Sequence, residues 1–204
     1  MLYTKLQNTI SSLDSKVVSE ERRQILQPLI DYIQIQTDSD QEIRLNFICT
    51  HNSRRSHLTQ VWAQAMAAKL GVKNVTCYSG GTEATAIFVA AKEALISAGF
   101  QILQLSESKN PVYAINFSQN SHPIIGFSKT FDADFNPTSN FAAILTCSQA
   151  DEGCPFIAGA EKRIPITYED PKAYDNSPLQ KEKYIERSMQ IATEMQYVFQ
   201  SITL

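Results

Sequence analysis

The sequence is poor in cysteine and histidine and has no long apolar run. Its 204 residues include 4 cysteines and 3 histidines. So few cysteines are more typical of catalytic, redox-active or buried thiols than of a disulfide framework. The histidines lack the spacing of metal ligands, so we expect neither a metal site nor a cofactor. No stretch reaches about 18 apolar residues, and residues 1–5 do not begin a signal peptide, which predicts a cytoplasmic protein without a membrane partner.

An excess of basic residues is missing as well. The formal net charge is −3 at pH 7, which gives no reason to expect a general affinity for nucleic acid or acidic membranes. At 204 residues, of which 43% are hydrophobic, the chain is long enough for one well-formed core but hardly for two. An anionic ligand must therefore be captured by a local arrangement of residues.

One such arrangement directly follows the apolar run 43–48. It reads Cys49-Thr50-His51-Asn52-Ser53-Arg54-Arg55-Ser56. A cysteine, five residues and an arginine between a predicted strand and a predicted helix bring together a thiolate, backbone N–H groups and a guanidinium. The helix that begins near Arg55 adds its positive dipole end, which favours the thiolate form of Cys49. The motif predicts chemistry on a phosphate-like anion.

Each position of this loop has an expected task. Cys49 is the nucleophile, and Arg55 holds two oxygens of the anion with its planar set of donors. Asn52 suits the sharp turn because it tolerates the left-handed conformation, and Ser56 can donate a hydrogen bond to the sulfur. The residues expected to bind the substrate are Thr50, His51, Asn52, Ser53, Arg54 and Ser56.

From residue 43 onward, strands and helices alternate. The periodicity predicts strands over 43–48, 75–79 and 141–146 and helices over 55–70, 86–97 and 179–203. Continuous apolar strands are typical of a parallel sheet covered on both faces. We therefore predict an α/β catalytic domain over 42–204, a three-layer sandwich around a mainly four-stranded parallel sheet. Its site is expected at the carboxyl ends of the strands, with the phosphate-binding loop after the first strand.

Two segments lie outside this alternation. Residues 1–41 are predicted to form a helical extension, with Ser19 as a helix cap and Pro28 expected to kink the helix or mark a break. We expect the extension to pack on the domain or on a second copy of the chain, so a homo-oligomer stays open. Two strand-like runs, at 112–117 and 124–127, predict an inserted hairpin.

From about residue 43 onward, the sequence resembles the low-molecular-weight protein tyrosine phosphatase superfamily, and within it most closely the thioredoxin-coupled arsenate reductases. The matching segments are the loop Cys49–Ser56, the run Tyr78-Ser79-Gly80-Gly81-Thr82 after the second predicted strand, and Asp170-Pro171. The resemblance implies the fold predicted above and a general acid at Asp170.

The reductase branch is indicated by a further segment, Leu145-Thr146-Cys147-Ser148-Gln149-Ala150-Asp151-Glu152-Gly153-Cys154-Pro155. The resemblance implies that Cys147 is the second thiol and Cys154 the third in a disulfide relay, with thioredoxin as the electron donor. From the residues alone, a small buried residue for Cys147 and a chance loop thiol for Cys154 are the favoured interpretations. Cys77, within a predicted strand, is expected to be structural.

The acid and the loop leave alternatives open. An Asp-Pro pair is often only a turn, and Glu169 and Asp175 are the nearby alternatives to Asp170. His51 and Arg54 depart from the family pattern, which usually has smaller residues at both positions. The added charge of Arg54 either favours a doubly charged anion or is simply solvated.

Three functions follow from these residues. The first is an arsenate reductase in which Cys49 attacks arsenate, Asp170 protonates the departing oxygen, and Cys147 and Cys154 complete the electron transfer. The second is a low-molecular-weight protein tyrosine phosphatase that hydrolyses phosphotyrosine or small phosphate esters through a phosphocysteine. The third is a non-catalytic anion-binding or redox-sensing module, against which the intact set of Cys49, Arg55 and Asp170 argues.

Overall fold

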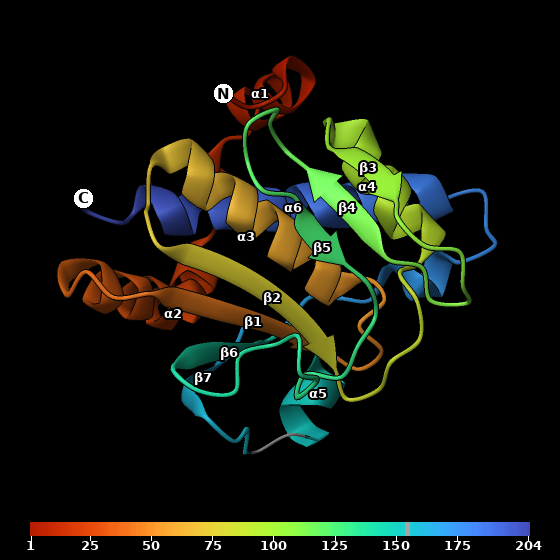
Figure 1. Ribbon diagram of the computed structural model, residues 1–204. Helices are drawn as coiled ribbons and strands as arrows, with labels where there is room; N and C mark the ends of the chain where they lie inside the picture. Colours follow the sequence, from red (N-terminus) through yellow and green to blue (C-terminus); the bar gives the residue numbers. More distant parts are fainter. Residues whose placement is uncertain (154–155) are drawn as a thin grey trace.

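A four-stranded parallel sheet forms the centre of the computed structural model, which describes residues 1–153 and 156–204 (Figure 1). Its strands are β1 (Ile43–Cys49), β2 (Val75–Gly81), β6 (Phe141–Leu145) and β7 (Ala160–Pro165). They lie in the order β2-β1-β6-β7, and every neighbouring pair is parallel. The predicted α/β fold is therefore confirmed. Because the strands are parallel, the loops that follow them emerge at one edge of the sheet.

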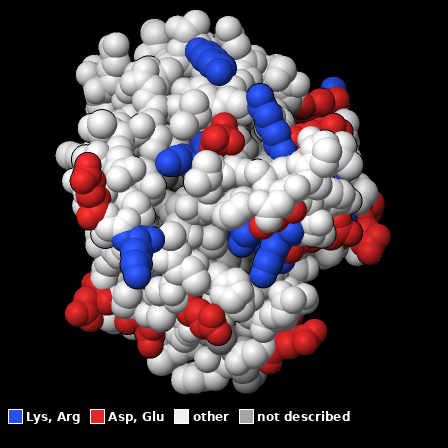
Figure 2. Space-filling view, turned by 90° about the vertical axis from the view of Figure 1, so that its right-hand side faces the viewer, with Lys and Arg blue, Asp and Glu red and all other residues white. Residues whose placement is uncertain are grey.

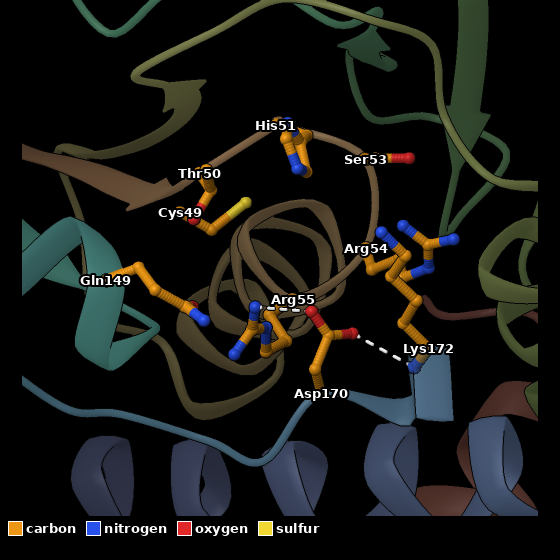
Figure 3. Close-up of a pocket in the computed structure, with 9 residues that line it drawn as sticks. All are labelled: Cys49, Thr50, His51, Ser53, Arg54, Arg55, Gln149, Asp170 and Lys172. Atoms are coloured by element: carbon orange, nitrogen blue, oxygen red, sulfur yellow. Dashed lines mark hydrogen bonds and ion pairs between the residues drawn. The ribbon is translucent and has the colours of Figure 1, made fainter. Parts of the chain in front are cut away.

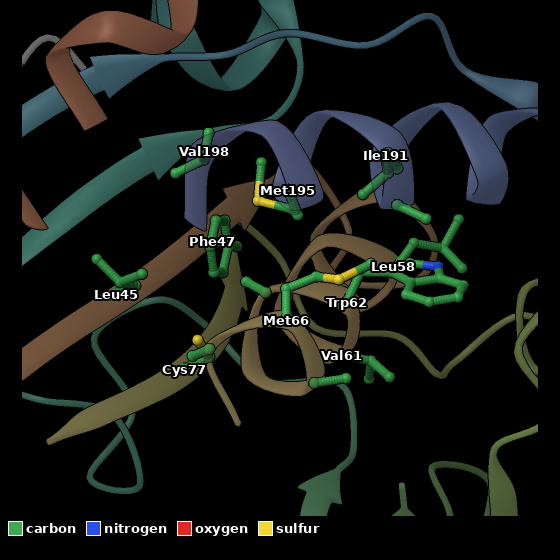
Figure 4. Close-up of a cluster of buried hydrophobic side chains, with 14 of the residues drawn as sticks. Leu45, Phe47, Leu58, Val61, Trp62, Met66, Cys77, Ile191, Met195 and Val198 are labelled. Carbon is green, nitrogen blue, oxygen red and sulfur yellow. The ribbon is translucent and has the colours of Figure 1, made fainter. Parts of the chain in front are cut away.

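Helices α3 (Arg55–Leu70) and α6 (Gln180–Gln200) pack together over one face of the sheet (Figure 4). Leu45 and Phe47, alternate residues of β1, are fully buried in the hydrophobic cluster between the sheet and these two helices. This spacing is the two-residue period of a strand. Trp62 of α3 is fully buried there too, and its Nε1 donates to Ser188 Oγ of α6 at 2.9 Å. This contact fixes the position of α3 and of the loop that precedes it.

The opposite face of the sheet is covered by α5 (Ser148–Gly153) and by part of the segment 127–140. Ile48 of β1 is fully buried on this side, where it clusters with Ala150 of α5 and with Phe131. The sheet thus has cover on both faces, which explains why its strands read as continuous apolar runs.

Two of the helices end where glycine permits a left-handed residue. α3 ends at Gly71, whose φ is +78°, and α4 (Val89–Ala98) ends at Gly99, whose φ is +113°. α4 begins three residues later than predicted because the preceding residues bond to the loop after β1 instead: Phe88 N donates to Ser53 O at 2.9 Å.

A small antiparallel sheet stands beside α4. It consists of β3 (Gln101–Gln104), β4 (Tyr113–Asn116) and β5 (Ile124–Gly126), in that order. β4 and β5 are the predicted hairpin. The sequence pattern does not reveal β3, because this strand has four residues, polar at both ends, none of which is buried.

The N-terminal segment is helical, as predicted, with α1 (Thr4–Ser11), the 3₁₀ turn η1 (Ser15–Val17) and α2 (Glu20–Asp38). Ser19 caps α2, since its side chain accepts a hydrogen bond from Arg22 N. Of the two outcomes predicted for Pro28, a kink or a break, the break is absent, because α2 continues through the proline. The fully buried Leu26 and Leu29 flank the proline, and their packing outweighs the lost backbone hydrogen bond.

These N-terminal helices belong to the main core. Leu6 of α1 and Leu26 of α2 are fully buried in the same cluster as Trp62. Tyr3 N donates to Phe117 O at 3.0 Å, which ties the chain start to the hairpin. The extension therefore packs on the rest of the chain, and the boundary at residues 41 and 42 stays a prediction. In the described part of the chain, no helix is long and apolar enough to cross a membrane.

We expect Gly80→Ala to lower the free energy of unfolding by about 2 kcal/mol, because an overpacked core site strains its neighbours. A Cβ at position 80 would come within 2.3 Å of Phe131 Cα. Urea denaturation measures the change. Gly153→Ala is the control, since a Cβ there meets nothing within 4 Å. Equal stability of the two variants would contradict the close packing of the segment 127–140 on β2.

Candidate active site

The loop between β1 and α3 is held from outside through its carbonyl groups. The oxygens of Cys49, Thr50, His51 and Ser53 each accept a hydrogen bond of 2.8–3.1 Å from a neighbouring segment. The donors are Thr82 N, Glu83 N, Ser128 Oγ and Phe88 N. In a trans peptide the next N–H points away from the C=O, and the described chain has no cis bond. Several loop N–H groups therefore turn to the inner side, as an anion cradle requires.

The sulfur of Cys49 is held at the bottom of this loop. Ser56 Oγ lies 3.1 Å from Cys49 Sγ, and Asn52 Nδ2 donates to the same Ser56 oxygen at 2.8 Å. Because the amide fills an acceptor position of the hydroxyl, the hydroxyl proton is free to point at the sulfur, where it stabilises a thiolate. Asn52 has the predicted left-handed backbone, with a φ of +42°.

A pocket of about 200 Å³ opens above Cys49 (Figure 3). Its lining residues are Cys49, Thr50, His51, Ser53, Arg54, Arg55, Gln149, Asp170 and Lys172. Two residues predicted to bind substrate, Asn52 and Ser56, are not part of this lining: both are fully buried and bond to each other. The other predicted loop residues line the pocket together with Asp170.

Arg55 and Asp170 form an ion pair within the pocket. Arg55 Nη2 lies 2.6 Å from Asp170 Oδ2, and Arg55 Nη1 donates to Tyr168 O at 2.9 Å. The other Asp170 oxygen accepts a hydrogen bond from Lys172 N at 3.0 Å. The arginine, although nearly buried, therefore has a carboxylate partner in the same pocket.

The two alternative carboxylates have partners elsewhere. Asp175 binds Arg54 Nη2 at 2.6 Å and accepts a hydrogen bond from Tyr184, whereas Glu169 is 92% exposed and pairs with Arg187. Of the three carboxylates weighed as the general acid, Asp170 is the one that lines the pocket.

Arg54 has a structural environment that neither of the two sequence interpretations foresaw. Besides Asp175, it donates from Nε to Tyr184 Oη at 2.6 Å, and its guanidinium lies 4.1 Å from the centroid of the Phe88 ring. Its charge is therefore neither solvated nor unpaired, although the side chain still lines the pocket. The hydrogen bond to Tyr184 and the ring contact attach the end of the loop to α6 and to the start of α4.

The predicted thiols lie in different places. Cys147 is fully buried at the end of β6, and its Sγ lies 3.4 Å from Thr50 Oγ1, next to the nucleophile in the chain. Cys77 is buried in the main core, where burial raises the pKa of its thiol. Cys49, Cys77 and Cys147 are free thiols. The prediction for Cys154 lies outside the described residues.

Two lining residues were missed by the sequence reasoning. Gln149, on α5, directs its carboxamide into the pocket, and the Lys172 side chain extends along the rim beside Arg54 (Figure 3). Each stands two positions after a predicted site residue, Cys147 or Asp170. That proximity was the available signal, but nothing local shows which way either side chain turns.

A buried lysine and a buried histidine lie beneath the loop. Lys129 N donates to Asn52 Oδ1 at 2.9 Å, while its ammonium lies over the rings of Phe127 and Phe135, 4.5 and 5.2 Å from their centroids. Burial lowers the pKa of Lys129 to about 8. Burial and the charge of Lys129 lower the pKa of His57 to about 3, so the imidazole stays neutral.

Figure 2 shows the side of the molecule toward which the arrowheads of β1 and β2 point in Figure 1. Several basic side chains lie toward the middle of this face, and most acidic ones lie near its outline. The pocket lining contains three basic residues, Arg54, Arg55 and Lys172, and one acidic residue, Asp170. Local positive charge at the pocket thus occurs on a chain whose net charge is −3.

Comparisons with family models and with curated protein sequences give no match. Among solved structures, the chain is similar to a low-molecular-weight phosphotyrosine phosphatase from Vibrio cholerae, with 14% identity and a TM-score of 0.54 over 78% of this chain and 95% of that one. A low-molecular-weight protein tyrosine phosphatase from T. tengcongensis is 18% identical, with a TM-score of 0.51 over 79% and 100% of the two chains. For an arsenate reductase the identity is 16% and the TM-score 0.49, over 79% and 99%.

The likeness to the two phosphatases shows a shared fold. The chain thus has the fold of the low-molecular-weight protein tyrosine phosphatases, and the resemblance inferred from the motifs is confirmed at this level.

We expect Lys129→Met to raise the free energy of unfolding at pH 7 by about 1–3 kcal/mol, because the folded state binds the lysine proton less tightly than the unfolded chain does. The pKa of Lys129 is about 8 in the folded protein and 10.5 in the unfolded chain. Between these pH values the unfolded chain binds more protons, so Lys129 makes the wild-type protein more stable as pH rises. The advantage of the variant should therefore shrink from pH 8 to pH 10. Urea denaturation at several pH values measures it, and a constant difference would contradict the lowered pKa.

Proposed function

We propose that this protein is an arsenate reductase in which Cys49 attacks the oxyanion and Cys147 resolves the adduct. The observation that carries this proposal is the place of Cys147, a free thiol 3.4 Å from Thr50 Oγ1 at the edge of the anion-binding loop. β1 and β6 are parallel neighbours that pair Ile48 with Leu145, so continuing the register sets Cys147 opposite Thr50. Because adjacent strands lie about 4.8 Å apart, a small movement of the Cys147 side chain would bring its sulfur to Cys49 Sγ.

The first step is nucleophilic. Cys49 Sγ attacks arsenic and a sulfur–arsenic bond forms, while the bond from arsenic to one hydroxyl group breaks. That hydroxyl leaves as water after receiving a proton from the carboxylic acid form of Asp170. Arg55 and the inward N–H groups bind the remaining oxygens, where charge develops. The hydrogen bond from Ser56 stabilises the thiolate before the attack.

The second step reduces arsenic. Cys147 Sγ attacks Cys49 Sγ, a disulfide forms, and the sulfur–arsenic bond breaks with its electron pair left on arsenic, so arsenic(V) becomes arsenic(III) and the two thiols are oxidised. Cys154 then attacks Cys147 and releases Cys49. An external dithiol, with thioredoxin as the expected donor, reduces the Cys147–Cys154 disulfide.

The pocket also suits a small oxyanion. Its nine lining residues, all within the described part of the chain, include no Phe, Tyr or Trp that would receive an aryl ester, and the one ring among them is the imidazole of His51. The lining instead offers donors: the loop, the guanidinium of Arg55 and the carboxamide of Gln149. A tetrahedral oxyanion can use all of them.

We expect Cys147→Ser to abolish arsenate-dependent NADPH oxidation in the presence of thioredoxin and thioredoxin reductase, because no thiol remains to form the disulfide with Cys49. Cys154→Ser should do the same. Cys77→Ala is the matched control and should keep at least half of the wild-type turnover, since Cys77 lies in the core of the sheet away from the pocket.

Turnover that persists in Cys147→Ser would contradict the relay. A wild type that oxidises no NADPH, but hydrolyses an aryl phosphate with or without Cys147, would instead make this protein a phosphatase with incidental thiols.

Phosphatase activity is the second candidate, and Asp170 is the observation that favours it. The Asp170 carboxyl group lies opposite Cys49 in the pocket, where its carboxylic acid form can protonate the leaving group of a phosphate ester before water hydrolyses the phosphocysteine. Two of the solved structures that share this fold at a TM-score above 0.5 are named as phosphatases, which also supports this candidate.

We expect Asp170→Asn to lower kcat for p-nitrophenyl phosphate or arsenate by about 10²-fold or more, because the general acid is lost. Glu169→Gln, at the exposed neighbour, is the control and should change kcat less than twofold. Phosphate binding, measured by calorimetry, should persist in Asp170→Asn. If neither the wild type nor Asp170→Asn turns over any substrate while both bind phosphate, the protein is an anion-binding module.

A further inference from the structure

Tyr168 connects three parts of the molecule. Its N–H donates to Thr146 O, beside Cys147, at 3.1 Å, and its carbonyl accepts the hydrogen bond from Arg55 Nη1 at 2.9 Å. The residue is 4% exposed, and its ring contacts Arg22. The position of this one residue therefore fixes a donor of the anion site and, two residues on, Asp170.

The Tyr168 ring rests against an ion pair between the N-terminal extension and the last helix. The guanidinium of Arg22, in the first turn of α2, lies 4.8 Å from the ring centroid, and Arg22 Nη2 binds Glu194 Oε2 of α6 at 2.8 Å. Glu194 is 4% exposed and also accepts a hydrogen bond from Gln190. Because the buried Glu194 carboxylate accepts hydrogen bonds from both Arg22 and Gln190, it holds the Arg22 guanidinium in one place.

We propose that Arg22 of the N-terminal extension is a positioning residue for the anion site, which it orders by clamping Tyr168 between α2 and α6. The path runs from Arg22 through the Tyr168 ring to the Tyr168 carbonyl, and from there to Arg55 and Asp170. The proposal rests on the function proposed above and assigns the extension a part in it. Small displacements of a catalytic group lower rates by large factors, so a loosened Tyr168 should reach the chemistry.

The chain contains a matched control in the next residue. Arg23 lies on the same helix turn, with its guanidinium 5.3 Å from the centroid of the Tyr197 ring and Nη2 donating to Lys16 O. It has the same charge and a similar ring contact, but Tyr197 holds no group of the site. Arg22→Gln should lower kcat/KM for arsenate or p-nitrophenyl phosphate at least tenfold, whereas Arg23→Gln should stay within twofold of the wild type.

Arg22→Gln also leaves the buried Glu194 charge without its partner and can weaken the fold. Arg22→Gln combined with Glu194→Gln removes this charge, so its melting temperature should return toward that of the wild type while kcat/KM stays at least tenfold low. Arg22→Lys keeps the ion pair but not the planar stacking and should have intermediate activity. A double variant with wild-type kcat/KM, or an equal loss in Arg23→Gln, would overturn the proposal.

A second measurement separates this inference from the proposed function. In ¹⁵N-labelled protein, the Arg55 Nε–H resonance, assigned with Arg55→Lys, should shift in Arg22→Gln and in the double variant but not in Arg23→Gln. If the wild type turns over neither substrate, the proposed function is wrong and this resonance still decides the role of Arg22. An unmoved resonance with normal turnover contradicts the role of Arg22 alone.

Discussion

The site depends on hydrogen bonds to the outer side of the loop after β1. Because the carbonyls of Cys49, Thr50, His51 and Ser53 are all engaged from outside, the loop keeps its curvature without a ligand, and an incoming anion need not reorganise it. The donors come from residues 82–88 after β2 and from Ser128 after β5. The inserted hairpin therefore supports the site, since it leads the chain to Ser128 and Lys129.

Charge pairing gives the site its second constraint. Arg54 and Arg55, neighbours in the chain, would repel each other if both faced the pocket unpaired. The structure gives each a carboxylate at 2.6 Å, Asp175 for Arg54 and Asp170 for Arg55. Arg54 thereby anchors the loop to α6, while Arg55 and its acid stay in the pocket. Buried charges of this kind are tolerated because they are paired and hydrogen-bonded.

Much of the fold was predictable because its signals are local. Strand β1, the helix ended by Gly71 and the helix capped by Ser19 each follow from residues within one or two turns. The short strand β3 lacks a usable period, and the uninterrupted helix at Pro28 depends on the packing of its neighbours against the core. In the site, the Cys49–Ser56 loop was predicted, whereas Gln149 and Lys172 were not.

The order of the elements and the chemistry of the loop follow from local patterns in the chain, because a strand, a turn and a helix N-terminus specify one another over fewer than about fifteen residues. Which distant groups complete the site depends on tertiary packing. Asp175 for Arg54, Tyr168 for Arg55, and Arg22 against the Tyr168 ring are contacts between residues 113 to 146 positions apart. Such pairs depend on how the sheet and helices stack, and that is set by the burial of the whole core rather than by neighbours along the chain.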